Sequence, residues 1–459
     1  MAQALRGGMC EGGFIVTIVE LYDDKPINNV VGTLAFSPDK VIYVGGNTRK
    51  HFDKKHLPVL RKYFNAKGYG SLEIEYVQVR RDSLKDIVDK FEEIYASDRD
   101  CKFLVEITGG EDQILIGMGV LSERHPDTEL YRVSSKLRTV SSYSVREETG
   151  KKRELECLNT VEENLMLHGA SIVSCNGSDM IEGGFRWNIE FLNDVNEMWN
   201  ICCHGADRTS GGAAPHHWNK AANLMAELES AYEQREDKLT LAVDKHYYNE
   251  VFLDDGTDAF FHKYIVCFMS NGLIDYTVEK DKVIIRFKNE QVRLLLTRAG
   301  LLLELKIYLI VMGLVNARGG DCLTGVTIDW DGEDDIGSAV KYLADPEDPS
   351  SKIDTLNEVD VAATCGLVPY FISCKNGRFT SDELYKLYSV GERFGKGYGK
   401  KIIAASNLDY ALGGGKNLIL QRAADMGICV IDDLYLKTDD EIAEDLRQVM
   451  ELPKVKQTN

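Results

Sequence analysis

The fold of this chain is decided by residues 357–377, NEVDVAATCGLVPYFISCKNG. Two apolar runs, Val359–Thr364 and Val368–Cys374, predict two short β-strands, and Gly366 between them predicts a tight turn. Three polar residues interrupt or end these strands: Asp360, Ser373 and Lys375. An isolated charge in such a setting carries a large desolvation cost unless it is paired or binds a metal. We therefore expect these side chains to belong to a functional site.

This stretch resembles the active-site hairpin of the PD-(D/E)xK restriction-endonuclease-like nucleases. In that hairpin an Asp on one strand is followed, on the return strand, by an acid, any residue and a Lys. The resemblance implies that Asp360 holds Mn²⁺ or Mg²⁺ against the scissile phosphate, and that Lys375 orients or deprotonates the attacking water. Ser373 departs from the pattern, because it stands where the second acid normally is. A serine is a weak, neutral ligand, so either the metal affinity is lower or the Cys374 carbonyl and water complete the metal's coordination. The departure also leaves open a site without activity.

The stretch Gly300–Leu314, GLLLELKIYLIVMGL, predicts a buried helix before the hairpin. Its only acid is Glu304, and the run is too short to span a membrane. A first-turn carboxylate is favoured by the helix dipole alone. Here, however, a predicted strand at Gly325–Trp330 and then the Asp360 hairpin follow. That order favours Glu304 as a third catalytic residue and second metal ligand.

Length and charge limit the possible functions. With 459 residues, about three domains are expected, and 44% hydrophobic residues are enough for full cores. A net charge of −19 argues against a surface that broadly coats nucleic acid. Nucleic-acid binding would then be local, at basic residues that follow the hairpin: Lys375, Arg378, Lys386, Arg393, Lys396, Lys400 and Lys401. A helix is predicted at Thr380–Phe394, with Glu383 at capping-box spacing, and a mobile basic segment at Gly395–Lys401.

The eleven cysteines show no C-x-x-C spacing, which predicts reduced thiols in a cytoplasmic protein. Cys202, Cys203 and His204, with His216–His217 nearby, fit no familiar zinc site. The first thirteen residues contain no apolar h-region, so no signal peptide is expected.

The N-terminal part alternates predicted strands and helices, which is typical of a doubly wound α/β domain. The strands are Phe14–Glu20, Lys40–Val44, Ser71–Val79 and Lys102–Ile107, and the helices His56–Lys67, Leu84–Tyr95 and Gln113–Leu121. Ligands of such domains bind beyond the carboxyl ends of the strands. Those ends carry Tyr22–Asn29, Gly45–Asn47 and Thr108–Gln113, where glycines and helix N-termini favour an anion. There is no G-x-G-x-x-G, so a dinucleotide cofactor is not expected.

The DDKPINNV helix entry, the ITGGEDQ turn and the nuclease-like C-terminus together resemble the CARF (CRISPR-associated Rossmann fold) effectors of type III CRISPR immunity. In that family two such domains pair and bind one cyclic oligoadenylate across the dimer axis, which implies a homodimer. The resemblance suggests ligand contacts from the three strand-end loops: Asp24, Lys25, Pro26, Asn28, Asn29, Gly46, Asn47, Thr108, Gly109, Gly110 and Gln113.

A helix at Phe260–Gly272, a hairpin of Leu273–Val278 and Lys282–Phe287, and a helix from Asn289 look like a winged-helix module. The mixed charges of its wing favour a spacer or dimer contact over DNA binding. The expected layout is a CARF domain over 1–150, a helical connector over 151–240, the winged-helix-like module over 241–300 and an α/β nuclease-like domain over 301–459.

The leading hypothesis is a dimeric, metal-dependent nuclease that cleaves DNA or RNA when a cyclic oligoadenylate, commonly the tetra-adenylate in the family, binds the N-terminal domains. Because a ligand activates only through its differential affinity, the dimer should close or rotate on binding. The alternative is a ligand-responsive nucleic-acid-binding regulator whose nuclease-like domain is inactive.

Overall fold

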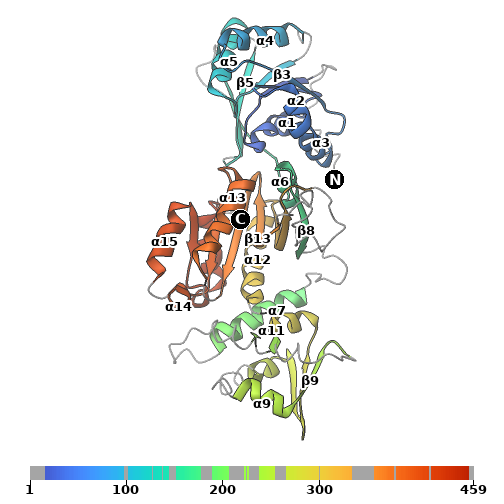
Figure 1. The fold of residues 1–459 in the computed structure, drawn as a ribbon, viewed down its shortest axis with the longest axis vertical. Helices are drawn as coiled ribbons and strands as arrows, with labels where there is room; N and C mark the ends of the chain where they lie inside the picture. The colour runs from blue at the N-terminus through green and yellow to red at the C-terminus, as the bar shows by residue number, and fades with distance from the viewer. Residues whose placement is uncertain are drawn as a thin grey trace, which may run out of the picture.

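The computed structural model describes residues 16–97, 102–126, 128–136, 138–143, 151–176, 189–205, 222–223, 225–226, 237–253, 265–298, 300–332, 356–376, 379–412 and 415–453. The described chain is mixed α/β and builds three sheets. Along the long axis, the N-terminal unit, the C-terminal sheet and a small three-stranded sheet follow one another (Figure 1).

The N-terminal sheet has the strand order β3-β2-β1-β4-β5-β6-β7. Its strands are β1 (Val16–Leu21), β2 (Lys40–Gly45), β3 (Glu73–Gln78), β4 (Lys102–Glu106), β5 (Glu129–Ser134), β6 (Thr139–Tyr143) and β7 (Lys152–Glu154). The first five in this order are parallel, whereas β6 and β7 add antiparallel strands. The predicted strand–helix alternation is confirmed to within a few residues. The sequence did not predict β5, β6 and β7, whose side chains are mostly half-buried or exposed.

Helices cover both faces of this sheet. On one face α1 (Val31–Phe36) and α3 (Leu57–Ala66) pack against Ile18, Val41 and Tyr43. On the other, α4 (Leu84–Ser97) and α5 (Asp112–Arg124) pack against Val19, Ile42 and Val105. Short turns of helix at η1 (Pro26–Asn29), α2 (Arg49–His51) and η2 (Phe52–His56) lie between these elements. Both faces are therefore buried, as a parallel sheet requires.

The C-terminal sheet has the order β16-β15-β14-β13-β12-β8. Its strands are β8 (Ser171–Asn176), β12 (Asp321–Asp329), β13 (Leu356–Cys365), β14 (Val368–Lys375), β15 (Lys400–Ala405) and β16 (Ile428–Ile431). Pairing is antiparallel from β8 to β14 and parallel from β14 to β16. The segment expected to be a helical connector with short strands thus supplies the edge strand β8 of this sheet.

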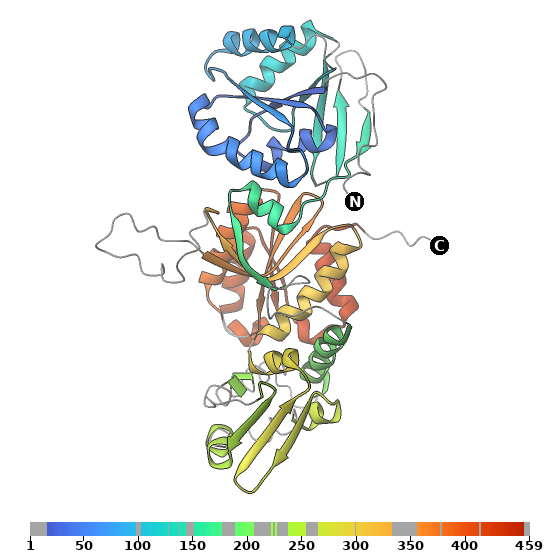
Figure 2. The same ribbon diagram turned by 90° about the vertical axis from the view of Figure 1, so that its right-hand side faces the viewer.

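Two layers of helices enclose this sheet (Figure 2). One layer holds α12 (Leu301–Asn316) and α16 (Asp439–Val449), with α7 (Ile189–Asn200) against α12. The other holds α6 (Val161–Leu167), α13 (Ser381–Gly395) and α15 (Lys416–Asp425). The smaller elements η3 (Ile201–Gly205), α14 (Leu408–Leu412) and η6 (Leu434–Leu436) complete the described chain here. The predicted helix–strand–hairpin order is confirmed.

Two expectations in this region are wrong. The basic residues Lys400 and Lys401 begin β15 and do not belong to a loop, because Lys401 lies buried beneath Gly391 and its Nζ contacts Glu392 Oε1 at 2.6 Å. The capping box at α13 is also absent. Thr380 Oγ1 accepts from the Asp382 amide, while the Glu383 carboxylate binds lysines.

The third sheet is antiparallel with the order β10-β11-β9. The predicted hairpin is present as β10 (Ile274–Val278) and β11 (Lys282–Phe287), preceded by a helix at residues 265–270 and followed by α11 (Glu290–Thr297). β9 (Thr240–Asp244) and α9 (Lys245–Leu253) were not predicted. No helix among the described residues is long and apolar enough to cross a membrane.

Candidate active site and ligand-binding loops

Asp360 lies where β13 and β14 separate. Their ladder runs from Cys365 paired with Val368 to Val361 paired with Ile372. At the next position the Asp360 carboxylate replaces the backbone partner. Its Oδ2 accepts from the Cys374 amide at 2.6 Å and from Ser373 Oγ at 3.1 Å. Side-chain bonding therefore ends the ladder and opens the sheet at this point.

Burial raises the pKa of Asp360, although the positive charge of Lys375 and the two hydrogen bonds oppose the rise. The Cys374 thiol is buried and its pKa is raised by that burial, so the thiol is protonated and only the carbonyl could serve a cation. The structure thus brings together Asp360, Ser373, Cys374 and Lys375, as the sequence predicted.

A cavity of about 290 Å³ lies against this fork, between the hairpin and α13. Its polar lining is Asn357, Glu358, Asp360, Ser373, Lys375, Glu383 and Lys386. Lys375 Nζ donates to Glu383 Oε2 at 2.7 Å, and Lys386 Nζ donates to Glu383 Oε1 at 2.8 Å. Burial disfavours the Glu383 carboxylate, but these lysines outweigh it and hold its pKa below the ordinary value. Glu383 was not predicted as a site residue.

Glu304 sits in the first turn of α12. Burial raises its pKa to about 8, and the negative charges of Asp360 and Glu358 add to the rise, while Lys375 opposes it. Glu304 is therefore close enough to the hairpin for the charges of Asp360 and Lys375 to change its pKa. It does not, however, line the cavity that Asp360 and Lys375 share.

A divalent cation needs several oxygen donors that converge on one point. Across the described ranges, no three His, Cys, Asp or Glu side chains gather closely enough to hold a metal ion as they stand. Glu304 and Asp360 are nevertheless two oxygen donors whose carboxylates are destabilised by burial and, for Glu304, by the neighbouring negative charge. A cation such as Mn²⁺ or Mg²⁺ would offset both costs. The residues therefore fit a two-carboxylate site completed by carbonyl and water oxygens.

At the N-terminal sheet, Asp23 joins two of the predicted ligand loops. Its carboxylate accepts from the Lys25 amide at 2.8 Å, from Asn28 Nδ2 at 3.1 Å and from the Gly110 amide at 3.2 Å. Its backbone exchanges two 2.8 Å hydrogen bonds with the Asn29 side chain. The sequence predicted an Asp of this pair, Asp23 or Asp24, only as a helix N-cap, and that prediction is wrong, because a short 3₁₀ turn begins at Pro26 and its N-cap residue is Lys25.

The predicted ligand residues divide into exposed and supporting ones. Asp24, Lys25 and Gln113 are exposed at the strand ends. Asn28 and Asn29 are buried, and Thr108 Oγ1 is bonded to Glu106 and to the Val133 amide. These three hold the loops in shape.

The glycines let the loops approach closely. A Cβ on Gly109 would lie 2.7 Å from Asp23 Oδ2, and Gly110 has a φ of +98°, which favours glycine. Gly46 lies under Arg81, whose guanidinium contacts Asn47 Oδ1 at 3.5 Å and Glu111 Oε1 at 2.7 Å. All three predicted loops therefore sit at the same edge of the sheet.

The first loop also contacts the C-terminal unit, at the end of α13 that faces the N-terminal unit (Figure 1). Tyr398 Oη donates to Asn28 Oδ1 at 2.6 Å, and Lys396 Nζ donates to the Asp24 carbonyl at 2.7 Å. Lys25 Nζ lies 5.7 Å from the centre of the Tyr398 ring. The basic segment that follows α13 thus contacts the first of the predicted ligand loops.

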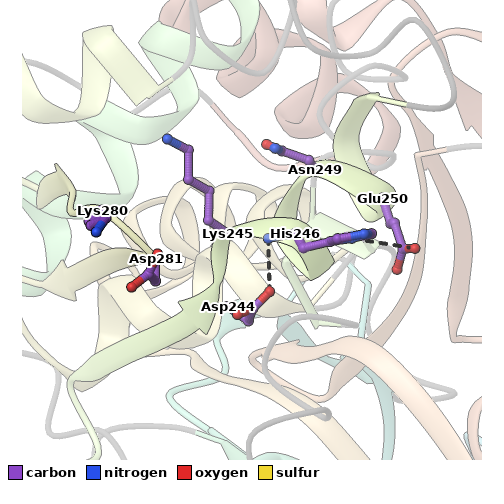
Figure 3. Close-up of a pocket in the computed structure, with 7 residues that line it drawn as sticks. All are labelled: Asp244, Lys245, His246, Asn249, Glu250, Lys280 and Asp281. Carbon is purple, nitrogen blue, oxygen red and sulfur yellow. Dashed lines mark hydrogen bonds and ion pairs between the residues drawn. The ribbon is translucent and has the colours of Figure 1, made fainter.

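A separate open hollow of about 490 Å³ lies at the tip of the three-stranded sheet (Figure 3). It is lined by Lys245, His246, Lys280 and four further polar residues, and the His246 amide donates to Asp244 Oδ1 at 2.8 Å. The cations beside Asp281 and Glu250 give it mixed charge. Cys202 and Cys203 are buried thiols whose pKa values burial raises, while Arg378 and His216–His217 lie outside the described residues.

Comparison with solved structures identifies the fold. The chain resembles the protein VC1899 from Vibrio cholerae, with a TM-score of 0.67 and 14% identity over 95% of this chain and 98% of that one. It also resembles Can2 from Sulfobacillus thermosulfidooxidans, solved in complex with cyclic tetra-adenylate, with a TM-score of 0.60 and 16% identity over the same shares of the two chains. At these identities the likeness establishes a shared fold along nearly the whole chain. No family model matches the sequence, and no curated protein matches it.

Proposed function

We propose that this protein is a cyclic-oligoadenylate-activated, divalent-metal-dependent nuclease of type III CRISPR defence that acts on DNA or RNA. The observation that carries the proposal is the opened fork of β13 and β14, where Asp360 and Lys375 share one cavity and are both electrostatically coupled to the largely buried Glu304 of α12. The fold shared with Can2, whose structure contains cyclic tetra-adenylate, supports the same conclusion.

In the proposed reaction a water oxygen attacks the phosphorus of a phosphodiester, and the bond from phosphorus to the leaving sugar oxygen breaks. Lys375 orients the water and stabilises the charge that develops on the phosphate oxygens. Asp360 is held in position by Ser373 and the Cys374 amide, so its free oxygen has a fixed direction. Glu304 and Asp360, with the Cys374 carbonyl and water, would hold Mn²⁺ or Mg²⁺, which would supply Lewis-acid polarisation of the phosphate.

The sensing role is assigned to the loops around Asp23 and Gly110. Backbone amides at a helix entry and the exposed Lys25 suit a phosphate-bearing ring. A homodimer is part of the proposal, because a two-fold ligand needs a two-fold receptor. The contact of Tyr398 and Lys396 with the first loop gives the ligand a direct mechanical connection to the C-terminal unit.

The test is a cleavage assay on labelled single-stranded DNA, labelled RNA and supercoiled plasmid, each with Mn²⁺ and with or without cyclic tetra- or hexa-adenylate. Ligand binding is measured in parallel by calorimetry. Cleavage that requires a ligand supports the proposal and identifies both the ring and the target. Tight ligand binding without cleavage of any substrate contradicts the nuclease part.

Two observations favour a second function, a ligand-responsive nucleic-acid-binding regulator. Position 373 carries a serine, and the described residues hold no preassembled three-ligand metal site. Lys375→Ala separates the two functions. In a nuclease the substitution abolishes cleavage and keeps ligand binding, whereas a regulator bound to DNA loses nothing measurable.

A further inference from the structure

On the face of β14 that borders the cavity, the proposed site lacks the acid that the hairpin motif normally has, because Ser373 stands at that position. Successive side chains of a strand point to opposite faces. Phe371 packs with Leu384 and Leu387 of α13, whereas Ile372 and Cys374 pack in the core that contains α12. Ser373 and Lys375 therefore face α13, on the side of the sheet opposite to the helix that carries Glu304. An acid on α12 does not line this cavity, and position 373 offers only a hydroxyl.

Glu383 of α13 is the acid that does enter the cavity from this side. It lines the cavity together with Asp360, Ser373 and Lys375. Its Oε2 lies 2.7 Å from Lys375 Nζ, and its negative charge raises the pKa of Asp360. The first turn of a helix also favours a carboxylate at this position.

We propose that Glu383 is a catalytic residue of this chain, and that its carboxylate replaces, from α13, the metal-binding acid that Ser373 does not provide on β14. This inference rests on the proposed metal site, and it assigns that site a ligand which neither the hairpin motif nor the fold comparison names.

In the described arrangement, both oxygens of Glu383 are occupied by Lys375 and Lys386. Metal binding would therefore exchange at least one lysine contact for a metal contact. That exchange frees Lys375 Nζ for the attacking water, so a single movement of Glu383 would assemble both parts of the site. The contact of Tyr398, three residues after the end of α13, with Asn28 of the first loop offers a route by which the ligand would favour this movement.

The test measures Mn²⁺ binding to the full chain by calorimetry, with no substrate present. Glu383→Gln keeps the shape of the side chain and removes its charge. The matched control is Glu392→Gln, because Glu392 lies on the same helix and pairs with Lys401 Nζ at 2.6 Å outside the cavity. Ser373→Glu is made alone and combined with Glu383→Gln, which completes a double-mutant cycle.

We expect Glu383→Gln to weaken Mn²⁺ binding by about tenfold or more, since loss of even an indirect metal partner costs about 10- to 100-fold. Ser373→Glu should restore binding in the Glu383→Gln background and change it little alone, and Glu392→Gln should bind like the wild type. The inference is overturned if Glu383→Gln binds Mn²⁺ like the wild type, or if the wild type binds no Mn²⁺.

A parallel cleavage assay distinguishes this inference from the proposed function. If Mn²⁺ binding depends on Glu383 but no substrate is cleaved, Glu383 is a metal ligand and the proposed nuclease activity is wrong. If cleavage depends on the cyclic oligoadenylate but Mn²⁺ binding is unchanged in Glu383→Gln, the proposed nuclease activity is supported and Glu383 is not a metal ligand.

Discussion

Replacing Glu304 by glutamine should make the protein more stable and less active at neutral pH. The folded chain holds this carboxyl group in a largely buried place, where its pKa is about 8 compared with 4.5 in the unfolded chain. Between these two values the folded state keeps a proton that the unfolded state has released. Stability from this group is therefore fully present below about pH 4.5 and is lost as pH rises towards 8.

The size of the effect follows from linkage. Each pKa unit corresponds to about 1.4 kcal/mol, so at pH 7 the buried acid costs the folded state about 3 kcal/mol, and at pH 5 less than about 1 kcal/mol. Glutamine has nearly the same shape and does not titrate. The Glu304→Gln protein should therefore exceed the wild type in unfolding free energy by about 3 kcal/mol at pH 7 and by much less at pH 5.

The assay is urea unfolding in EDTA at both pH values, followed by circular dichroism. Glu162→Gln serves as the control, because Glu162 is an exposed acid in the first turn of α6. In Mn²⁺ the difference in unfolding free energy between Glu304→Gln and the wild type should shrink or change sign. Only the wild type carries both metal-binding carboxylates, and a bound metal stabilises the folded state that binds it.

An equal stability of Glu304→Gln and wild type at pH 7, or a gain that is the same at both pH values, would refute this reasoning. Either result would mean that Glu304 is not held at an electrostatic cost. The case for Glu304 as a functional acid would then lose its physical basis.

Three further results are expected. Asp23→Ala removes the carboxylate that joins the first loop to Gly110, so calorimetry should show ligand binding weakened at least about tenfold in a folded protein; unchanged affinity would exclude the loop assignment. Tyr398→Phe deletes the hydrogen bond to Asn28, worth about 1 kcal/mol, and should raise the ligand concentration for half-maximal cleavage about fivefold; an unshifted titration would mean that the contact does not organise the loop. Glu20→Gln should stabilise the N-terminal unit at pH 7 and not at pH 4.5, because burial raises the Glu20 pKa to about 8; thermal unfolding at the two pH values checks this, and a pH-independent change would contradict it.

Much of the fold could be predicted because its central elements are strongly patterned. The hairpin of β13 and β14 follows from two apolar runs around a glycine, which has a φ of +65° at position 366. α12 follows from its near-continuous apolar sequence. The positions of β5 to β8, of which β7 and β8 are edge strands, could not be predicted, since these strands are short and carry polar or half-buried side chains.

The sequence predicted the site residues that local strand patterns mark, and it did not predict those that tertiary contacts bring to the site. Asp360 and Lys375 are marked by their positions in apolar strands. Glu383 gave only a signal for helix capping, because sequence spacing does not show that α13 returns its first turn over Lys375. Asp23 and Tyr398 were missed for the same reason, as their partners are Gly110 and Asn28, far away in sequence.

The central claim is that ligand bound at the N-terminal loops controls hydrolysis at the Asp360–Lys375 fork. The most direct measurement is plasmid cleavage in Mn²⁺ by wild type and Lys375→Ala, each with and without cyclic tetra-adenylate, with ligand binding measured on the same samples. We predict cleavage only by the wild type with ligand, a loss of about 100-fold or more in Lys375→Ala, and equal ligand affinity of the two proteins. Cleavage without ligand, or equal cleavage by both proteins, would contradict the account.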